Sequence, residues 1–145
     1  MTPSIMVERL YENARLPEKG TRHSSGYDLR WWPFEDNQHL LMPGSTLMAG
    51  TGIKVAIPEG YEGQIRGRSS IAAKGILTHP GTIDSDYRGE LIVHLRHVGD
   101  KPHRMKAGDR IAQIVFVPLQ AVNMIEAQKL DDPGTRIGGF GSTGR

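Results

Sequence analysis

Residues 90–98 read ELIVHLRHV, and Leu91, Val93 and Leu95 fall at every second position of this run. An apolar residue at every second position is the pattern of a β-strand with one buried face, so we expect a strand at residues 90–97. Outward from this run, further short segments of strand-like composition lie at residues 51–57, 61–66, 109–118 and 121–127. Many short strands between glycine and proline turns favour a β-sandwich or barrel, so we expect an all-β chain.

Glycine and proline are frequent, at 18 and 9 residues, and they leave few windows long enough for a helix. The one helix that we expect is short, with Ser69 or Ser70 as its N-cap and Gly75 as its end. Residues 131–145 have almost nothing to bury, so they are expected to form a mobile, glycine-rich tail. We therefore expect a barrel domain over residues 1–130, followed by this flexible C-terminal segment.

Length and composition exclude several classes of protein. With 145 residues and a mass of 16.0 kDa, the chain has the size of one ordinary domain. It has no cysteine, which excludes a disulfide framework, a thiolate zinc site and a cysteine nucleophile. A formal net charge of +2 is too small to attract duplex nucleic acid by itself, so no nucleic-acid partner is expected. No apolar run is long enough to cross a membrane and no signal peptide is visible, so we expect a cytoplasmic protein without a membrane partner.

Five glycine-flanked segments are more polar and richer in glycine than a connection between strands requires. The first, SSGYDLR at residues 24–30, holds Asp28 in a strand-like run, and alone it is typical of a turn or edge residue. The second, GQIRGRSSIAAKG at residues 63–75, places Arg68 before two hydroxyls that open the expected helix. A guanidinium beside the free N–H groups of a helix start favours a phosphate, whereas Ser69 could equally be only a cap.

The third segment, HPGTIDSDYRGE at residues 79–90, carries three acids around Tyr87. It is compatible with a metal loop, with a general base and its neighbours, or with a solvated turn, although the spacing of an EF-hand is absent. Asp84 follows the apolar Ile83, which would put its carboxylate at a strand end, where it can orient a water molecule. Tyr87 could present a flat face to a sugar or a base.

The fourth segment, GDRIAQIVF at residues 108–116, has one uncharged polar residue, Gln113, in an apolar run. A buried amide needs hydrogen-bond partners, so Gln113 is expected to face a ligand, a subunit contact or a backbone group. The fifth, TRIGGFGSTGR at residues 135–145, is rich in glycine, whose backbone can wrap phosphates, and its Phe140 offers a stacking face. It lacks the lysine and the spacing of a Walker motif.

In this order and spacing, the five segments resemble the five motifs of the homotrimeric dUTP pyrophosphatase (dUTPase) family. The matching stretches are SGYDL, GRSS, GTIDSDYRGE, GDRIAQIVF and GGFGSTG, and together they span residues 25–144. The resemblance implies a jelly-roll or β-clip barrel that hydrolyses dUTP to dUMP and pyrophosphate with Mg²⁺, which removes dUTP and supplies dUMP for thymidylate synthesis. It also implies a homotrimer whose active sites are shared between subunits.

The resemblance also implies roles for single residues. Asp84 matches the carboxylate that activates the attacking water, Tyr87 the tyrosine that packs on the deoxyribose, and Asp28 an acid near metal-bound waters. Mg²⁺ itself would be held mainly by the triphosphate. Thr82 and Ile83 match a hairpin that holds the nucleoside, and residues 131–145 match a lid that closes over it. The substrate-binding residues that the resemblance implies are Arg68, Ser69, Ser70, Thr78, Thr82, Ile83, Tyr87, Ile92, Gln113, Arg136, Phe140, Gly141, Ser142 and Thr143.

Three departures from the family pattern bear on specificity. Ser70 stands where the commoner motif has glycine, and Arg136 lies one residue closer to Phe140 than is usual. The segment before Asp84 is shortened, and Thr78 stands where many members have the asparagine that reads uracil. A deoxynucleotide pyrophosphatase of relaxed specificity is therefore one alternative.

Two further alternatives share the same fold. A dCTP deaminase-like enzyme would need a glutamate where this chain has His94, and it would lack the tail motif. A regulatory protein that acts through protein partners is the non-enzymatic alternative, which the retained Asp84, Tyr87 and tail disfavour.

Overall fold

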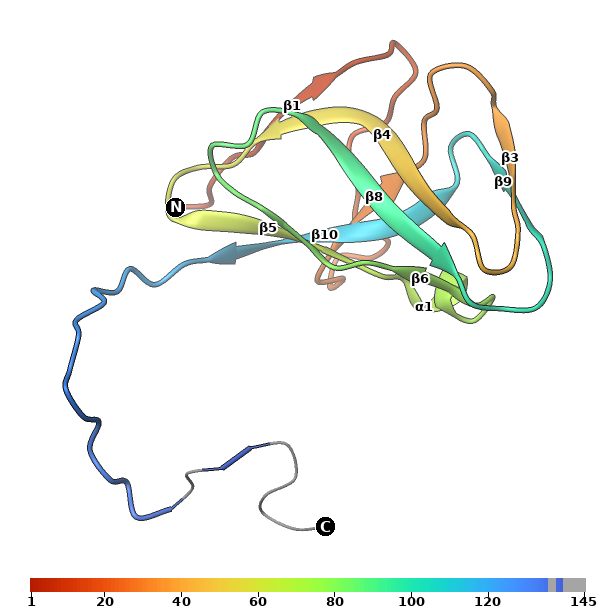
Figure 1. The fold of residues 1–145 in the computed structure, drawn as a ribbon. Helices are drawn as coiled ribbons and strands as arrows, with labels where there is room; N and C mark the ends of the chain where they lie inside the picture. Colours follow the sequence, from red (N-terminus) through yellow and green to blue (C-terminus); the bar gives the residue numbers. More distant parts are fainter. Residues whose placement is uncertain (136–137, 140–145) are drawn as a thin grey trace.

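The computed structural model describes residues 1–135 and 138–139, and almost all of their regular structure is β (Figure 1). In chain order the elements are β1 (Met6–Arg9), β2 (Tyr27–Arg30), β3 (Gln38–Leu41), β4 (Thr46–Ala56), β5 (Tyr61–Arg66), α1 (Ser69–Ala72), β6 (Ile76–Thr78), β7 (Gly81–Ile83), β8 (Glu90–His97), β9 (His103–Lys106) and β10 (Arg110–Pro118). The expected all-β chain with one short helix is confirmed. In the part of the chain that is described, no helix has the length and apolar character needed to cross a membrane.

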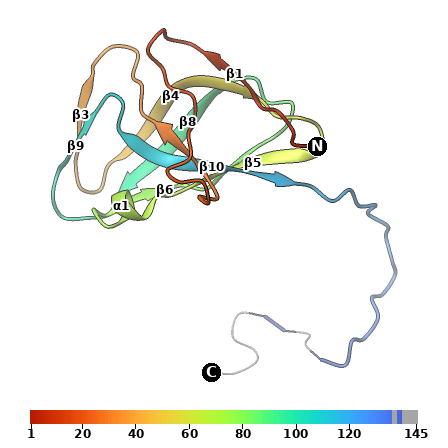
Figure 2. The same ribbon diagram turned by 180° about the vertical axis from the view of Figure 1, so that it is seen from behind.

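Two four-stranded antiparallel sheets make the body of the molecule. One has the strand order β1-β4-β8-β6 and the other has the order β2-β10-β5-β7, while β3 pairs with β9 in a separate ribbon. The two opposite views show β4 and β8 on one side of the molecule and β10 on the other (Figures 1 and 2). This is the arrangement of a jelly roll, in which the inner faces of two sheets share one core.

The core lies between the sheets and consists of residues that alternate along the strands. Leu91, Val93 and Leu95 of β8 are completely buried, as the alternation in their segment predicts. Ile111 and Ile114 of β10 are buried as completely. Burying each such side chain contributes about 1.5–3 kcal/mol, so the two sheets hold together without a disulfide.

Helix α1 begins differently from the expectation. Its N-cap is Arg68, in an extended conformation, and no side chain caps the first turn, so neither Ser69 nor Ser70 is the cap. Both serines instead lie inside the single helical turn, with exposed side chains. Gly75 ends the segment as predicted, because its φ of +82° is left-handed and a Cβ there would collide with the backbone of Gly99.

The expected strand over residues 121–127 is not formed. β10 ends at Pro118, and residues 119–135 contain neither helix nor strand. Figure 1 shows this segment running away from the two sheets. A strand needs a neighbour to pair its backbone groups, and none of the described residues of this chain supplies one. We refer to residues 119–130 as the C-terminal arm.

Candidate active site

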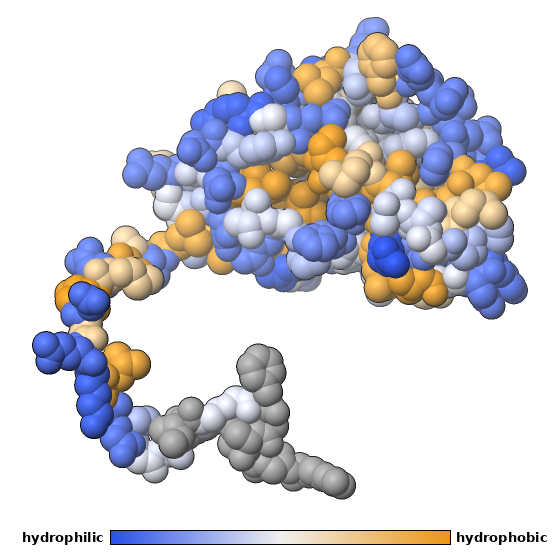
Figure 3. Space-filling view, in the orientation of Figure 1, coloured by the Kyte–Doolittle hydropathy of each residue, from blue (hydrophilic) through white to orange (hydrophobic). Residues whose placement is uncertain are grey.

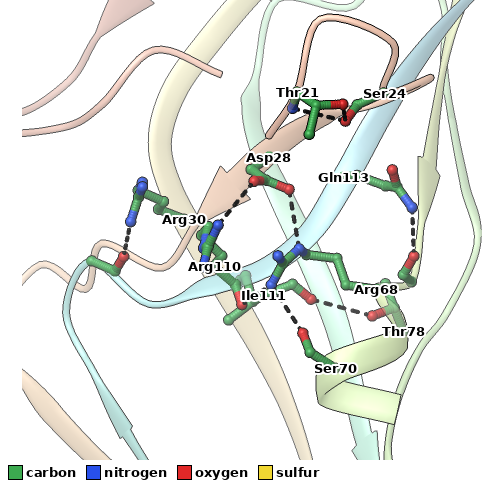
Figure 4. A network of polar contacts seen from close by, with 12 residues as sticks. Thr21, Ser24, Asp28, Arg30, Arg68, Ser70, Thr78, Arg110, Ile111 and Gln113 are labelled. Atoms are coloured by element: carbon green, nitrogen blue, oxygen red, sulfur yellow. Dashed lines mark hydrogen bonds and ion pairs between the residues drawn. The ribbon is translucent and has the colours of Figure 1, made fainter. Parts of the chain in front are cut away.

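Asp28 on β2 lies at the centre of an ionic cluster that joins three segments of the chain (Figure 4). Its Oδ1 is 3.0 Å from Nε of Arg68, which precedes α1, and its Oδ2 is 3.6 Å from Nη1 of Arg110, at the start of β10. The side chains of Asp28 and Arg68 are only 15% and 20% exposed, so solvent screens this pair little. Two guanidinium groups share one carboxylate, and the cluster therefore keeps a net positive charge.

Arg68 is held in one orientation by further hydrogen bonds. Its Nη1 donates to Oγ of Ser70 at 3.2 Å and to the backbone oxygen of Arg110 at 3.5 Å. A guanidinium fixed at several points needs little further ordering when it binds an anion such as phosphate. Because α1 has only four residues, the attraction of this region for an anion depends on the arginines and not on a helix dipole.

Gln113 on β10 completes this group from the neighbouring strand. It pairs with Asp28 across β2 and β10, and its Nε2 donates to the backbone oxygen of Gly67 at 2.9 Å. Of the three kinds of partner that the sequence allows for this amide, a backbone group is therefore present. Gly26 lies against the same side chain, and a Cβ at Gly26 would collide with the amide oxygen, which explains the glycine of the SGYDL motif. We call Asp28, Arg68, Ser70, Arg110 and Gln113 the cationic cluster.

Thr78 lies beside the cationic cluster at the end of β6 (Figure 4). Its Oγ1 donates to the backbone oxygen of Ile111 at 3.4 Å, so the hydroxyl already has a partner within the chain. Ser69 is nearby as the first residue of α1. The structure thus brings together six of the predicted site residues: Asp28, Arg68, Ser69, Ser70, Thr78 and Gln113.

A polar cavity of about 260 Å³ opens beside the cationic cluster. Its lining consists of Arg68, Ser70, Ile71, Lys74, His103, Met105, Asp109, Arg110 and Ile111. Burial lowers the pKa of His103 below its usual value and Lys74 lowers it further, although Asp109 acts in the opposite direction. Three permanent cations around one hollow suit an anionic ligand.

Sequence reasoning missed Arg110 and His103. Arg110 opens the fourth polar segment, and its charge beside an apolar strand was the available signal. His103 has no such signal, because only the fold brings β9 next to the turn that carries Arg68.

Asp84 stands on the loop after β7, as the sequence predicts for a carboxylate at a strand end. Its side chain is exposed, and its backbone oxygen accepts the N–H of Tyr87 at 3.1 Å, which closes a turn. The Tyr87 hydroxyl donates to the backbone oxygen of Glu90 at 2.8 Å, and a Cβ at Gly89 would collide with that hydroxyl. The residue is 40% exposed, so Tyr87 is fixed at its hydroxyl and still open to a ligand.

The segment around Asp84 is not the hairpin that was expected. Thr82 and Ile83 lie on β7, which pairs with β5, whereas β8 pairs with β4 and β6. Since β7 and β8 belong to different sheets, residues 84–89 cross from one sheet to the other. Ile92 lies on β8 opposite Gly50 and is half-buried.

Asp84 and the cationic cluster lie at different ends of the same sheet. Ile83 pairs with Gly63, so Asp84 follows at the level of Glu62, whereas Gln113 pairs with Arg66. The four residue steps between these levels correspond to about 13 Å along the strand. One chain therefore does not bring the predicted base and the predicted phosphate ligands together. The predicted tail residues Arg136, Phe140, Gly141, Ser142 and Thr143 lie outside the described residues.

The donor groups of the site bear on the expected Mg²⁺. Residues 1–135 and 138–139 contain no group of three or more histidine, cysteine or acidic residues that could hold a metal. The two oxygens of Asp28 face Arg68 and Arg110, so this carboxylate is not free to bind an ion directly. Mg²⁺ commonly keeps several waters and takes its remaining oxygen ligands from substrate phosphates. The residues present fit Mg²⁺ in that mode, with the triphosphate as the main ligand.

Comparison with known proteins gives consistent matches over nearly the whole chain. A sequence model described as dUTPase matches residues 12–144. A deoxyuridine 5'-triphosphate nucleotidohydrolase of Hydrogenobaculum is 43% identical over 143 residues, covering 97% of this chain and 97% of that protein. A protein of the same name from Brucella melitensis is 45% identical over 148 residues, covering 98% and 94%. A mutant dUTPase of Staphylococcus bacteriophage 80alpha, solved with dUpNHpp, aligns with a TM-score of 0.85 at 26% identity, covering 99% of both chains.

Proposed function

The chain belongs to the dUTPase family, and from this premise we propose that it is an enzyme that hydrolyses dUTP to dUMP and pyrophosphate. The observation that carries the proposal is the 43% identity to a relative named for this reaction, over 97% of both chains. All five predicted motifs fall within the matched residues 12–144. A cytoplasmic location stays a prediction, which fractionation of cells that express the untagged chain would test.

Asp84 is the general base in this proposal. Its exposed carboxylate, at the end of a strand, takes a proton from a water molecule. The water oxygen then forms a bond to the α-phosphorus, and the bond from that phosphorus to the oxygen that bridges to the β-phosphate breaks. Pyrophosphate leaves with the electron pair of that bond, and dUMP remains. Tyr87, fixed through Glu90, supports the deoxyribose.

The cationic cluster binds the triphosphate. Arg68 supplies the principal charge, and Asp28 acts as a positioning residue that keeps the guanidinium in one plane. Ser69, Ser70 and Gln113 add hydrogen-bonding groups, while Thr78, Thr82, Ile83 and Ile92 stay predicted contacts of the nucleoside. When bound, Mg²⁺ would offset part of the negative charge of the triphosphate.

A homotrimer with shared active sites is supported by the division of the site. Asp84 and the cationic cluster are too far apart in one chain to act on the same phosphate, so a second copy would complete each site. Phosphates bound at the cluster of one copy would face Asp84 of a neighbour. This arrangement makes each site depend on an interface between copies.

The C-terminal arm supplies a second argument for assembly. Its large apolar side chains are exposed, which is unfavourable for a chain on its own. They are Leu119, Val122, Met124, Ile125 and Leu130. Figure 3 shows hydrophobic surface at intervals along the coloured part of the extension. An apolar groove of about 470 Å³ beside the edge strand β1 includes Val7, Leu16 and Phe116 in its lining. The C-terminal arm of one copy could bury its apolar residues in the groove of a neighbouring copy. Residues 131–145 of the first copy would then reach the active site of that neighbour as a lid.

The basic test is a pyrophosphate-release assay with dUTP, dCTP and dTTP. Pyrophosphate from dUTP with little from the others supports the proposed enzyme. Ammonia from dCTP would support the deaminase alternative, and no turnover of any nucleotide would support a regulatory protein.

The division of the site is tested by mixing two inactive variants. Asp84→Asn lacks the base and Arg68→Ala lacks the main phosphate ligand, so neither homotrimer should be active. Random reassembly of equal amounts should restore about a quarter of the wild-type activity, because one site in four combines an intact Asp84 with an intact Arg68. A mixture that remains inactive after verified exchange of subunits would place the whole site within one chain.

A further inference from the structure

Two histidines stand side by side on the outer face of the first sheet, and the proposed function uses neither. His79 directly follows β6, and His94 lies in the middle of the neighbouring β8. The backbone N–H of His79 donates to the backbone oxygen of His94 at 2.8 Å, which fixes the two residues opposite each other. Both side chains are exposed, and their ring centres are 5.7 Å apart with an interplanar angle of 31°.

This spacing matches that of two imidazoles on one metal ion. A metal–nitrogen bond of about 2.1 Å puts the ion about 3.2 Å from each ring centre, so tetrahedral binding separates the centres by about 5.2 Å. The observed 5.7 Å needs only a small adjustment of two exposed side chains. Since the backbone bond already holds both residues, chelation orders little more than the rings.

The neighbouring groups decide which kind of ion fits. Met48 on β4 pairs with His94 from the other side, and its exposed thioether is a soft donor. The row His79, His94 and Met48 thus contains no carboxylate. Mg²⁺, which needs oxygen ligands, has no partner in this row, whereas imidazole suits Zn²⁺, Ni²⁺ and Cu²⁺.

We propose that His79 and His94 form a binding site for a divalent transition-metal ion, with affinity increasing from Ni²⁺ to Cu²⁺. The site is separate from the Mg²⁺ that accompanies the triphosphate and does not depend on the proposed function. An ion bound there ties the connection between β6 and β7 to β8. Because His79 begins the segment that leads to Asp84, the ion fixes one end of that segment.

The experiment is calorimetric titration of the untagged, EDTA-treated full chain with Ni²⁺ and with Cu²⁺, in excess Mg²⁺. We expect one ion per chain, with His79→Ala and His94→Ala each weakening affinity at least about tenfold, because loss of one ligand ends the chelate effect. His39→Ala is the matched control, since His39 is also exposed but lies on the separate ribbon of β3 and β9. It should bind as the wild type does.

Thermal unfolding supplies an independent measurement. Ni²⁺ should raise the melting temperature of the wild type and of His39→Ala but not that of His79→Ala or His94→Ala. Equal melting temperatures of all four proteins in EDTA would show that the variants fold. Unchanged affinity in either the His79 or the His94 variant, or an equal loss in the His39 variant, would overturn the proposal.

Discussion

Among single residues, the proposed chemistry depends most on Asp84. We expect Asp84→Asn to bind dUTP nearly as well as the wild type but to lower kcat by several orders of magnitude. The amide keeps the shape of the carboxylate and can hold a water, yet it cannot accept the proton. Calorimetry with a non-hydrolysable analogue measures binding, and steady-state kinetics measures kcat. Asp86→Asn, on the same exposed loop, is the matched control and should keep its kcat. More than about a tenth of the wild-type kcat in Asp84→Asn would assign the base to another group.

Thr78 bears on the selectivity for the base. Its hydroxyl already donates to Ile111, whereas an asparagine amide has both a donor and an acceptor to offer. We therefore expect dUTP to be preferred with measurable hydrolysis of dTTP or dCTP, and Thr78→Asn to raise the preference by roughly tens-fold. Specificity constants for the three nucleotides provide the measurement. A wild-type preference above about ten-thousand-fold over both competitors would contradict the relaxed pocket.

For single residues, the sequence predicted types of group better than their partners. A polar residue in an apolar strand needs a hydrogen bond, and Gln113 has one to a backbone oxygen. The role of Asp28 could not be predicted, because Arg68 and Arg110 are distant in sequence and only the pairing of β2 with β10 brings all three together. The serine cap was wrong because the residue before it, Arg68, has the extended backbone that an N-cap requires.

Among the secondary-structure elements, two strands were predicted with both ends correct. The expected segments at residues 61–66 and 90–97 are β5 and β8 to the residue. The ribbon of β3 and β9 was not predicted, since most of its residues are exposed and carry no alternating pattern. The segment 121–127 has the composition of a strand but no neighbour in the described chain. Composition alone does not say whether a partner strand exists.

The start of β9 gives a prediction about pH. Burial lowers the pKa of His103 below 6.5, Lys74 and His97 lower it further, and Asp109 opposes them. In the range below pH 6.5, the unfolded chain therefore binds more protons than the folded chain. The contribution of neutral His103 to the free energy of unfolding is complete above pH 6.5 and is lost as the pH falls towards the folded pKa. We expect the urea concentration at the unfolding midpoint to decrease as the pH is lowered from about 7 to about 5, and to decrease less in His103→Gln.

The exposed His39 provides the control for this effect. His39→Gln should keep the pH dependence of the wild type, because His39 is open to solvent on β3. An identical slope in His103→Gln and the wild type would show that protonation of other groups destabilises the fold in this range.

For the whole molecule, the described residues beyond Pro118, where β10 ends, contain no strand, so removal of residues 131–145 takes none of the strands of the two sheets. We expect a chain that ends at Leu130 to fold and trimerise, while kcat/KM for dUTP falls at least about a hundredfold because no lid excludes water. Light scattering and steady-state kinetics measure these effects. A chain that ends at Pro118 also lacks the C-terminal arm and should lose the trimer. Near-normal kinetics in the longer truncation would exclude a lid.

The position of Asp84 and the cationic cluster at different ends of one sheet has a consequence for gene dosage. A catalyst divided between copies does nothing as a newly made single chain, and its output depends on how often copies meet. Below the dissociation constant of the proposed trimer, the rate would rise with about the third power of the chain concentration. A twofold fall in protein abundance in that range would then lower the rate of dUTP clearance about eightfold.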